Sequence, residues 1–217
     1  MRDTSRVRSL CSLALAALLA AAAWSSPPAY AQDDLYGPGT PADVTWVRGV
    51  NAEASGGLGI RVADGPLLSV AWGDATPYRP VSPGQVELDL GGTILSIEVE
   101  AGAFLSVVAT GDEPLVIVDT ALVDVSRGLL SLYNLTRIEA LDLRAADGTS
   151  VISDVAPGTH AAVIIAEAEV ALEVSSGDEV LGALEARLYE RGVAHSVMVV
   201  EGPDGPHVRY VAAVASE

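Results

Sequence analysis

Short motifs recur along this chain, and their repetition limits its fold more than any other feature. Residues 60–65 read IRVADG and residues 143–148 read LRAADG, a displacement of 83 positions. The same displacement carries Val50-Asn51 onto Tyr133-Asn134. Ordered self-similarity of this kind indicates a tandem duplication. Two more pairs continue the order: Val81-Ser82-Pro83-Gly84 with Val155-Ala156-Pro157-Gly158, and Glu100-Ala101-Gly102 with Glu190-Arg191-Gly192, the latter followed by Ser106-Val107 and Ser196-Val197.

The repeats divide the chain into two domains of similar size. We expect the first domain at residues 43–120 and the second at residues 127–217, joined by a linker at 121–126. Each copy is small, but it is long enough to fold around a core of its own.

Alternation of apolar and polar residues predicts that both copies consist of β-strands. Leu58, Ile60 and Val62 alternate with Gly59 and Arg61, and a period of two places one face in the core and the other in water. Asp-Gly and Pro-Gly turns separate such runs. We therefore predict an all-β chain of two tandem, small antiparallel β-sandwich domains. The same alternation is present at 85–90, 93–100 and 170–174.

One segment is ambiguous. Leu181, Leu184 and Leu188 have helical spacing, so residues 179–191 could form a helix. The matching segment of the first copy, residues 93–100, alternates as a strand, and this favours a strand in the second copy as well.

The first residues have the features of an export signal. Three arginines precede an apolar run, and Ala29-Tyr30-Ala31 offers small residues where signal peptidase cleaves. We expect residues 1–31 to be removed and residues 32–42, rich in proline and glycine, to form an extended N-terminal segment. The sole cysteine, Cys11, would leave with the signal, which excludes disulfides and cysteine nucleophiles.

The charge of the chain excludes several classes of partner. Its formal net charge is −17, and it contains no lysine. Such a surface repels phosphate backbones and anionic lipids. We therefore expect no nucleic-acid binding and no membrane insertion after signal cleavage.

Few residues carry recognisable chemistry. His160, His195 and His207 are not spaced as metal ligands, and no Gly-x-Ser-x-Gly motif is present. We assign no catalytic, cofactor-binding or metal-binding residue, although a Ser–His–Asp triad assembled from distant residues stays open. An exported polysaccharide-binding β-sandwich is another alternative, but it would need exposed aromatic residues, and only 5% of the residues are aromatic.

The order of the motifs resembles one known family. The segment Leu35-Tyr36-Gly37-Pro38, followed by Trp46-Val47-Arg48 and Asn51-Ala52, is similar to the start of the AlgF family, periplasmic accessory proteins of alginate O-acetylation. The chain departs from the family at Val50, where an aromatic residue is expected before the asparagine. The resemblance covers nearly all of residues 34–210 and continues through Asp64, Val81-Ser82-Pro83-Gly84, Tyr133-Asn134, Ala146-Asp147-Gly148 and Val155-Ala156-Pro157-Gly158.

The resemblance implies a function without an active site in this chain. Acetyl transfer would belong to separate serine-dependent acetyltransferases, and this chain would be a non-catalytic periplasmic adaptor that organises them. Its partners would be the alginate O-acetyltransferase proteins, with the polysaccharide itself a second candidate, and it would need no cofactor. Protein interfaces are often anchored by aromatic and arginine side chains. We therefore predict Tyr36, Trp46 and Arg48 as partner-binding residues.

Four other interpretations stay open. For Trp46 and Arg48, the alternative is a structural role, in the core and on a solvated strand face respectively. An exposed row of aromatic residues would favour polysaccharide binding. A Ser–His contact in a pocket would favour an acetyl esterase or transferase, and an unrelated exported structural protein is the remaining alternative.

Overall fold

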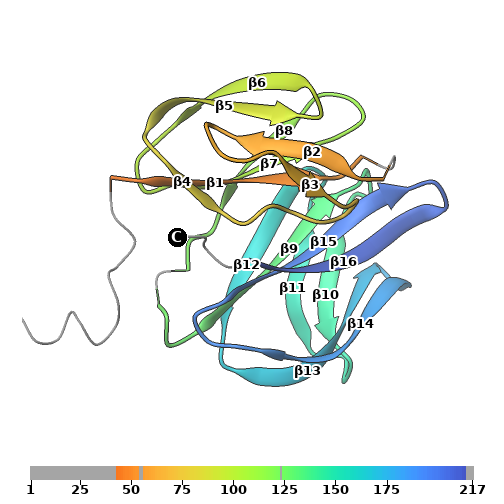
Figure 1. Cartoon of the computed structure of the whole chain (residues 1–217). Helices are drawn as coiled ribbons and strands as arrows, with labels where there is room; N and C mark the ends of the chain where they lie inside the picture. Colours follow the sequence, from red (N-terminus) through yellow and green to blue (C-terminus); the bar gives the residue numbers. More distant parts are fainter. Residues whose placement is uncertain (1–42, 54–55, 123, 214–217) are drawn as a thin grey trace, which may run out of the picture. The chain divides into compact units, whose positions relative to one another are not determined.

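The computed structural model describes residues 43–53, 56–122 and 124–213 of the 217-residue chain. Every helix or strand assigned in these ranges is a β-strand, as the sequence predicts (Figure 1). The expected signal peptide and the segment at 32–42 lie outside the described residues. No helix within these ranges has the length and apolar character needed to cross a membrane.

The strands fall into two consecutive sets of eight. The first half contains β1 (Thr45–Asn51), β2 (Leu58–Val62), β3 (Leu68–Val70), β4 (Arg79–Val81), β5 (Gly84–Leu90), β6 (Thr93–Val99), β7 (Phe104–Ala109) and β8 (Leu115–Asp119). The second half contains β9 (Gly128–Leu135), β10 (Leu141–Ala145), β11 (Ser150–Val155), β12 (Thr159–Ile165), β13 (Ala168–Ser176), β14 (Glu179–Tyr189), β15 (Ala194–Gly202) and β16 (Gly205–Ala213).

Each half contains two four-stranded sheets. In the first half, the first outer sheet has the order β3-β2-β5-β6, and the first inner sheet has the order β4-β1-β7-β8. The second outer sheet, β11-β10-β13-β14, and the second inner sheet, β12-β9-β15-β16, repeat these orders with every strand number raised by eight. Neighbours are antiparallel except for the central pairs β1–β7 and β9–β15, which are parallel. The repeated topology confirms the predicted all-β, duplicated sandwich fold.

Each half encloses its own hydrophobic core between its outer and inner sheets. Ile60 and Leu88 of the first outer sheet pack against Val107 of the first inner sheet, and all three are fully buried. Leu143, Leu172 and Val197 occupy the corresponding places in the second half. The outer strands bury mainly alternate residues, so their sequences show the period of two that predicted them.

A third apolar cluster joins the two inner sheets. Val50 and Val108 of the first half meet Tyr133 and Met198 of the second half. The strands β1, β7, β9 and β15 are therefore buried on both faces, and their burial does not alternate. Continuous burial is typical of parallel strands covered on two sides.

The two halves form one compact unit, which spans Thr40–Glu217. Strand β8 ends at Asp119 and β9 begins at Gly128, and no sheet in the described ranges mixes strands of both halves. The domain limits predicted from the sequence stay a proposal, because the third cluster gives the halves a shared core.

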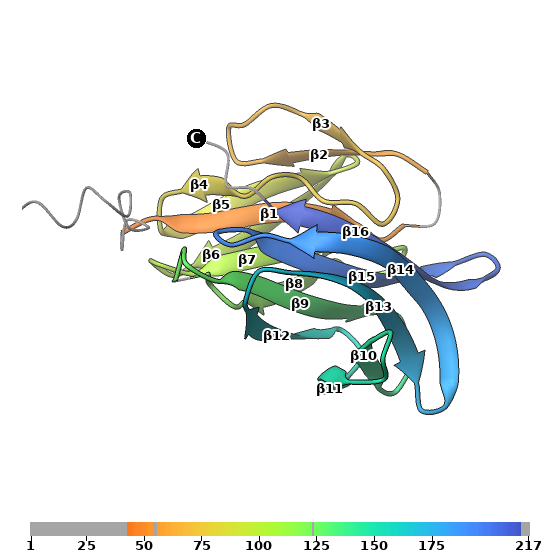
Figure 2. The same ribbon diagram turned by 90° about the horizontal axis from the view of Figure 1, so that it is seen from below.

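The ambiguous segment is strand β14, as favoured by its match with β6. The pairing of β13 with β14 contains two register shifts. Such bulges interrupt the period of two and bend the strands, and Figure 2 shows β13 and β14 as a long curved hairpin. Leu181 and Leu184, three positions apart, consequently both pack on the second core. The apparent helical spacing is the result of a bulged strand.

The repeated asparagine has the same structural task in both halves. Asn51 Nδ2 donates to the carbonyl oxygens of Gly56 and Val70, at 2.8 and 3.0 Å. Asn134 Nδ2 donates to the carbonyl oxygens of Ile138 and Val155, also at 2.8 and 3.0 Å. Both asparagines are fully buried, and they are the only two in the chain. Each one fastens the loop after the first strand of its half to the end of the third strand.

One pair of repeated motifs is not structurally equivalent. Val81-Ser82-Pro83-Gly84 connects β4 to β5, whereas Val155-Ala156-Pro157-Gly158 connects β11 to β12, the counterparts of β3 and β4. The true counterpart of Val155 is Val70, because each ends the strand that its asparagine fastens. Gly84 and Gly158 both have positive φ, of 113° and 69°. Their similarity reflects the needs of a tight turn, whereas the other three repeated pairs do align.

Candidate functional site

The junction between the inner sheets contains two of the three predicted partner-binding residues. Trp46 and Arg48 lie two positions apart on β1, so both face the second half. Trp46 is partly buried and stacks on Phe104, with ring centroids 6.0 Å apart. Arg48 is fully buried, and Tyr36 lies outside the described residues. Contact of these three residues with a partner stays a prediction.

Arg48 makes three hydrogen bonds across the junction. Its Nε donates to Ser106 Oγ on β7 at 2.8 Å. Its Nη2 donates to the Tyr133 hydroxyl on β9 at 3.0 Å and to Ser196 Oγ on β15 at 3.2 Å. The guanidinium also lies over the ring of Tyr78, 4.6 Å from its centroid. A single side chain of the first half thus binds two strands of the second.

Asp119, at the end of β8, balances this buried charge through intermediate hydroxyls. Its Oδ2 accepts hydrogen bonds from Tyr78 and Ser106, and its Oδ1 accepts one from Tyr133, each at 2.7 Å. Ser106 and Tyr133 therefore accept from Arg48 and donate to Asp119. The result is a hydroxyl-bridged ion pair that links both halves, which we call the Arg48–Asp119 network.

Electrostatics keep this network in one protonation state. Burial by itself lowers the pKa of Arg48, but the attraction of Tyr78, Tyr133 and Asp119 outweighs burial and the net pKa is raised. Burial is the main cause that raises the pKa of Tyr78 and of Tyr133, although Arg48 opposes it. Both phenols therefore keep their protons at neutral pH and donate them to the carboxylate.

Sequence reasoning did not identify most of this network. It placed Arg48 on an exposed face or in a partner contact, and it used Ser106 and Ser196 only as markers of the repeat. Asp119 and Tyr78 belong to none of the recurring sequence motifs. The one available signal was that Ser106 and Ser196 recur at equivalent positions within apolar strands, where a repeated hydroxyl requires a hydrogen-bond partner.

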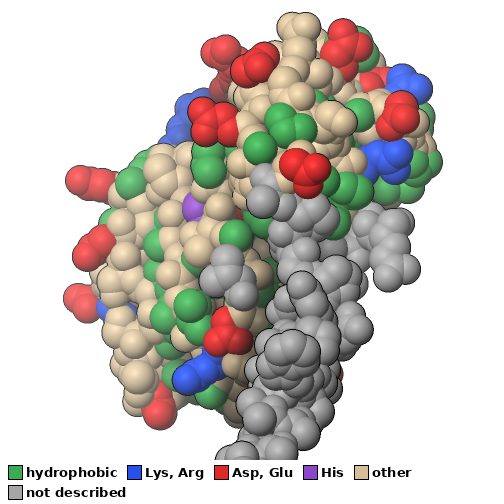
Figure 3. All heavy atoms as spheres, turned by 90° about the vertical axis from the view of Figure 1, so that its left-hand side faces the viewer, with side chains coloured by type: hydrophobic (Ala, Val, Ile, Leu, Met, Phe, Trp, Pro, Cys, Tyr) green, Lys and Arg blue, Asp and Glu red, His purple; other side chains and the backbone are tan. Residues whose placement is uncertain are grey.

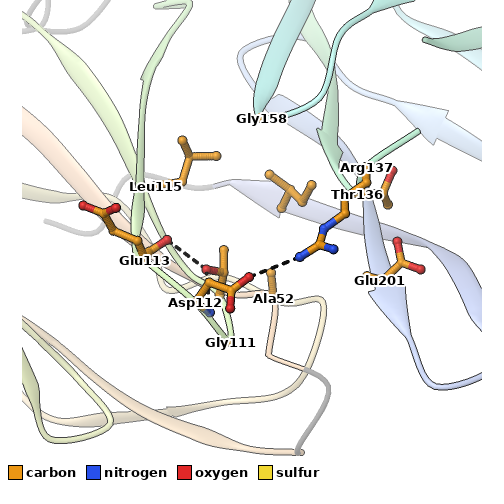
Figure 4. A pocket seen from close by; sticks show the side chains of 11 residues that line it. Ala52, Gly111, Asp112, Glu113, Leu115, Thr136, Arg137, Gly158 and Glu201 are labelled. Atoms are coloured by element: carbon orange, nitrogen blue, oxygen red, sulfur yellow. Dashed lines mark hydrogen bonds and ion pairs between the residues drawn. The ribbon is translucent and has the colours of Figure 1, made fainter. Parts of the chain in front are cut away.

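A cleft of about 550 Å³ lies at another part of the junction (Figure 4). Its lining includes the acidic side chains of Asp112, Glu113 and Glu201. Arg137 pairs with Asp112 at 3.2 Å, and both side chains are exposed, so this ion pair contributes little stability. Because three carboxylates and one arginine line the cleft, it is more suited to a cationic group than to an anionic one.

The three histidines contact aromatic rings or backbone groups. No group of three or more His, Cys, Asp or Glu residues in the described ranges is placed to hold a metal ion. His160 stacks on Tyr133 at 5.1 Å and approaches the backbone amide of Thr120 at 3.2 Å. His207 packs edge-on against Trp72, which brings the β3–β4 loop of the first half against the β15–β16 hairpin.

His195 is buried in the second half, with a fixed tautomer. Its Nε2 lies 3.2 Å from the carbonyl oxygen of Glu190, which can only accept, so Nε2 carries the proton. Its Nδ1 then accepts the hydroxyl hydrogen of Tyr210 at 2.7 Å. Burial lowers the pKa of His195 below its ordinary value.

Stability should consequently fall on mild acidification. A histidine in the unfolded chain has a pKa of about 6.5, so below that pH the unfolded state binds the proton before the folded state does. The free energy of unfolding should decrease as the pH falls through the depressed folded pKa of His195. The free energy of unfolding would be measured with urea at about pH 8 and about pH 5. Its decrease between these two pH values should be smaller for His195→Gln than for the unchanged protein. His207→Gln is the control, and equal decreases in all three proteins would contradict the prediction.

Comparison with known proteins identifies a family and several similar solved structures. The family model described as "Alginate O-acetyl transferase AlgF" matches residues 16–196. The chain is similar to the solved C-terminal domain of AlgF from P. aeruginosa, at 26% identity over 40% of this chain and 98% of that one, with a TM-score of 0.37. It is also similar to the N-terminal domain of the same protein, at 20% identity over 37% of this chain and 99% of that one, with a TM-score of 0.33. No curated protein sequence matches the chain.

Proposed function

This chain belongs to the AlgF family, because the family model covers most of its length, and we propose that it serves alginate O-acetylation as a non-catalytic adaptor. In this proposal it works in the periplasm and organises separate acetyltransferases. The family membership supports the link to alginate O-acetyl transfer, and the following observations support the adaptor role.

The observation that carries the proposal is the Arg48–Asp119 network. Its hydrogen bonds, together with the third apolar cluster, hold the two sandwiches against each other. The hydrogen bonds of Arg48 and Asp119 fix the geometry of this contact, and Nη1 is the one nitrogen of the Arg48 guanidinium without a partner in the described part of the chain. A rigid pair of sandwiches offers two partner proteins separate faces on one platform, and this is what an adaptor requires.

The environment of the serines and histidines supports a non-catalytic role. Arg48 donates hydrogen bonds to Ser106 and Ser196, and no hydrogen bond in the described part of the chain joins a serine to His160 or His195. A serine nucleophile needs an adjacent general base. We therefore propose that the acetyl-transfer chemistry belongs to the partners.

The polysaccharide-binding alternative has less support. All seven aromatic side chains in the described ranges are buried or partly buried, so no exposed row of them is present there. Carboxylates are spread over the face in Figure 3, and three carboxylates line the cleft of Figure 4. These charges oppose a polyanion and favour a partner protein with basic residues.

Tyr36 and Trp46 remain the partner contacts that we propose. The substitution Arg48→Glu cannot test partner binding, because it would place a second carboxylate beside Asp119 in a buried site and disturb the fold. Tyr36→Ala is the better test, since Tyr36 precedes the first described strand.

Deletion of this chain should remove most acetyl esters from secreted alginate while leaving the polymer yield unchanged. The reason is that an adaptor acts on acetylation and not on polymerisation. Acetyl content would be measured in a deletion strain and after complementation with the unchanged chain or with Tyr36→Ala. The purified protein alone should neither transfer nor hydrolyse acetyl groups. Unchanged acetylation in the deletion strain would refute the proposed function, and activity of the purified chain would refute the non-catalytic role.

A further inference from the structure

A second, smaller pocket lies beside the Arg48–Asp119 network, with a volume of about 220 Å³. One part of its wall is the stacked pair Trp46 and Phe104, which are register partners on β1 and β7. The equivalent register partners of the second half, Leu129 and Ala194, also line the pocket. Two large rings in one copy thus correspond to two smaller side chains in the other, and this difference leaves the space.

The same asymmetry supplies a free hydroxyl group. Ser131 occupies the position equivalent to Arg48, lines the pocket and is 4% exposed. Within the described residues, its hydroxyl has no hydrogen-bond partner. The Ser131 side chain lines the pocket, and its oxygen is not among the fully enclosed unpaired atoms of the described residues. The hydroxyl is therefore accessible from the pocket, where a bound molecule can complete its hydrogen bonding.

The polar atoms that lack partners near this pocket are donors. Trp46 Nε1 and Arg48 Nη1 are both buried without an acceptor in the described part of the chain. The guanidinium of Arg48 is bound to Tyr133 and Ser196, which line the pocket. A ligand suited to this region therefore supplies an acceptor oxygen.

We propose that the pocket binds a small neutral acyl group, such as the acetyl group of an ester. The methyl group would contact the rings of Trp46 and Phe104, and the carbonyl oxygen would accept a hydrogen bond from the Ser131 hydroxyl. A neutral ligand fits because Asp119 already balances the charge of Arg48. A ligand with many hydroxyl groups would be left with unpaired polar atoms, which are costly to bury.

This inference rests on the proposed function, because acetyl is the group that the pathway of the AlgF family transfers. The acetyl group could be borne by the polymer or by a small acyl carrier. The recognised chemistry is the same in both cases, and the choice of probes separates them.

The test observes the indole N–H signal of Trp46 by NMR during titration. In the protein without the expected signal peptide, residues 1–31, Trp46→Phe and Trp72→Phe assign the two indole signals. Trp72 does not line the pocket. The probes are triacetin with glycerol as its control, and O-acetylated alginate oligosaccharides with the same oligosaccharides after alkaline deacetylation. An acetylated probe should shift the Trp46 signal saturably, the deacetylated probes should not, and the Trp72 signal should stay unchanged.

The outcomes identify the source of the acyl group. A response to acetylated oligosaccharide alone indicates a polymer-borne ester, and a response to triacetin alone indicates a small carrier. A response to both shows that the acetyl group suffices. If the Trp46 signal moves with neither acetylated probe, or equally with the deacetylated ones, the inference is wrong.

Substitutions test the hydrogen bond itself. Ser131→Ala should weaken the affinity for the acetylated probe roughly fivefold, which is the usual effect of losing one hydrogen bond. The control is Ser175→Ala on β13, because Ser175 is a buried serine with an unpaired hydroxyl that lies outside the pocket. Equal affinity of Ser131→Ala and the unchanged protein would overturn the assigned contact. Loss of acetylation on deletion, combined with no acyl binding, would leave the adaptor role standing and remove only this inference.

Discussion

Replacing Arg48 with methionine is expected to lower the free energy of unfolding by about 3–5 kcal/mol, the usual effect of removing one partner of a buried ion pair. The substitution leaves the carboxylate of Asp119 buried without its countercharge. It also removes the hydrogen bonds to Tyr133 and Ser196 that join the halves. Urea unfolding at neutral pH would measure the loss.

A surface arginine provides the matched control for this substitution. Arg61 pairs with Asp89 at 2.9 Å, but its side chain is 46% exposed, so Arg61→Met should cost no more than about 1 kcal/mol. Adding Asp119→Asn to Arg48→Met removes the uncompensated charge and should recover part of the loss. The double substitution should therefore cost less than the sum of the single ones. Additive effects would show that Arg48 and Asp119 do not act as a pair.

Asn134→Asp is expected to have a comparably large effect, about 3–5 kcal/mol, because it buries a charge and leaves acceptors unpaired. The substitution replaces the donating amide by an oxygen that faces the carbonyl oxygens of Ile138 and Val155. Asn51→Asp should reproduce the effect in the first half, where Gly56 and Val70 supply the carbonyls. Urea unfolding would give the size of each effect.

Hydrogen exchange would locate these effects within the chain. We expect Asn134→Asp to lower amide protection first in β9–β11 and Asn51→Asp to lower it first in β1–β3, because each asparagine fastens its own half. If the free energy of unfolding of either variant changed by less than about 1 kcal/mol, or if both variants showed the same pattern of exchange, the role of each asparagine in fastening its own half would be contradicted.

The sequence predicted those strands that have one buried face and one exposed face. In β5, Val86, Leu88 and Leu90 are buried while Gln85 and Glu87 are exposed, so the alternation was visible. It did not show that β1 and β9 bury both faces, because a continuous apolar run does not state what covers it. The contact between the inner sheets was consequently not predicted.

The buried network could not be predicted for a related reason. Arg48 and Asp119 lie far apart in the chain and are connected through the hydroxyls of Ser106 and Tyr133. No local spacing marks such an arrangement, and an arginine beside apolar residues usually indicates an exposed strand face. Only the fold brings these four side chains together.

The contact between the inner sheets uses equivalent positions of the two copies. Val50 and Tyr133 are repeat partners, and both belong to the third cluster. A single-copy ancestor could have made such a contact by pairing with itself as a two-fold dimer, in which both subunits present the same patch. In a homodimer any change would appear on both sides at once. Within a single chain that constraint does not apply, so one position can be Arg48 while its equivalent is Ser131, an arrangement closed to any symmetric pair.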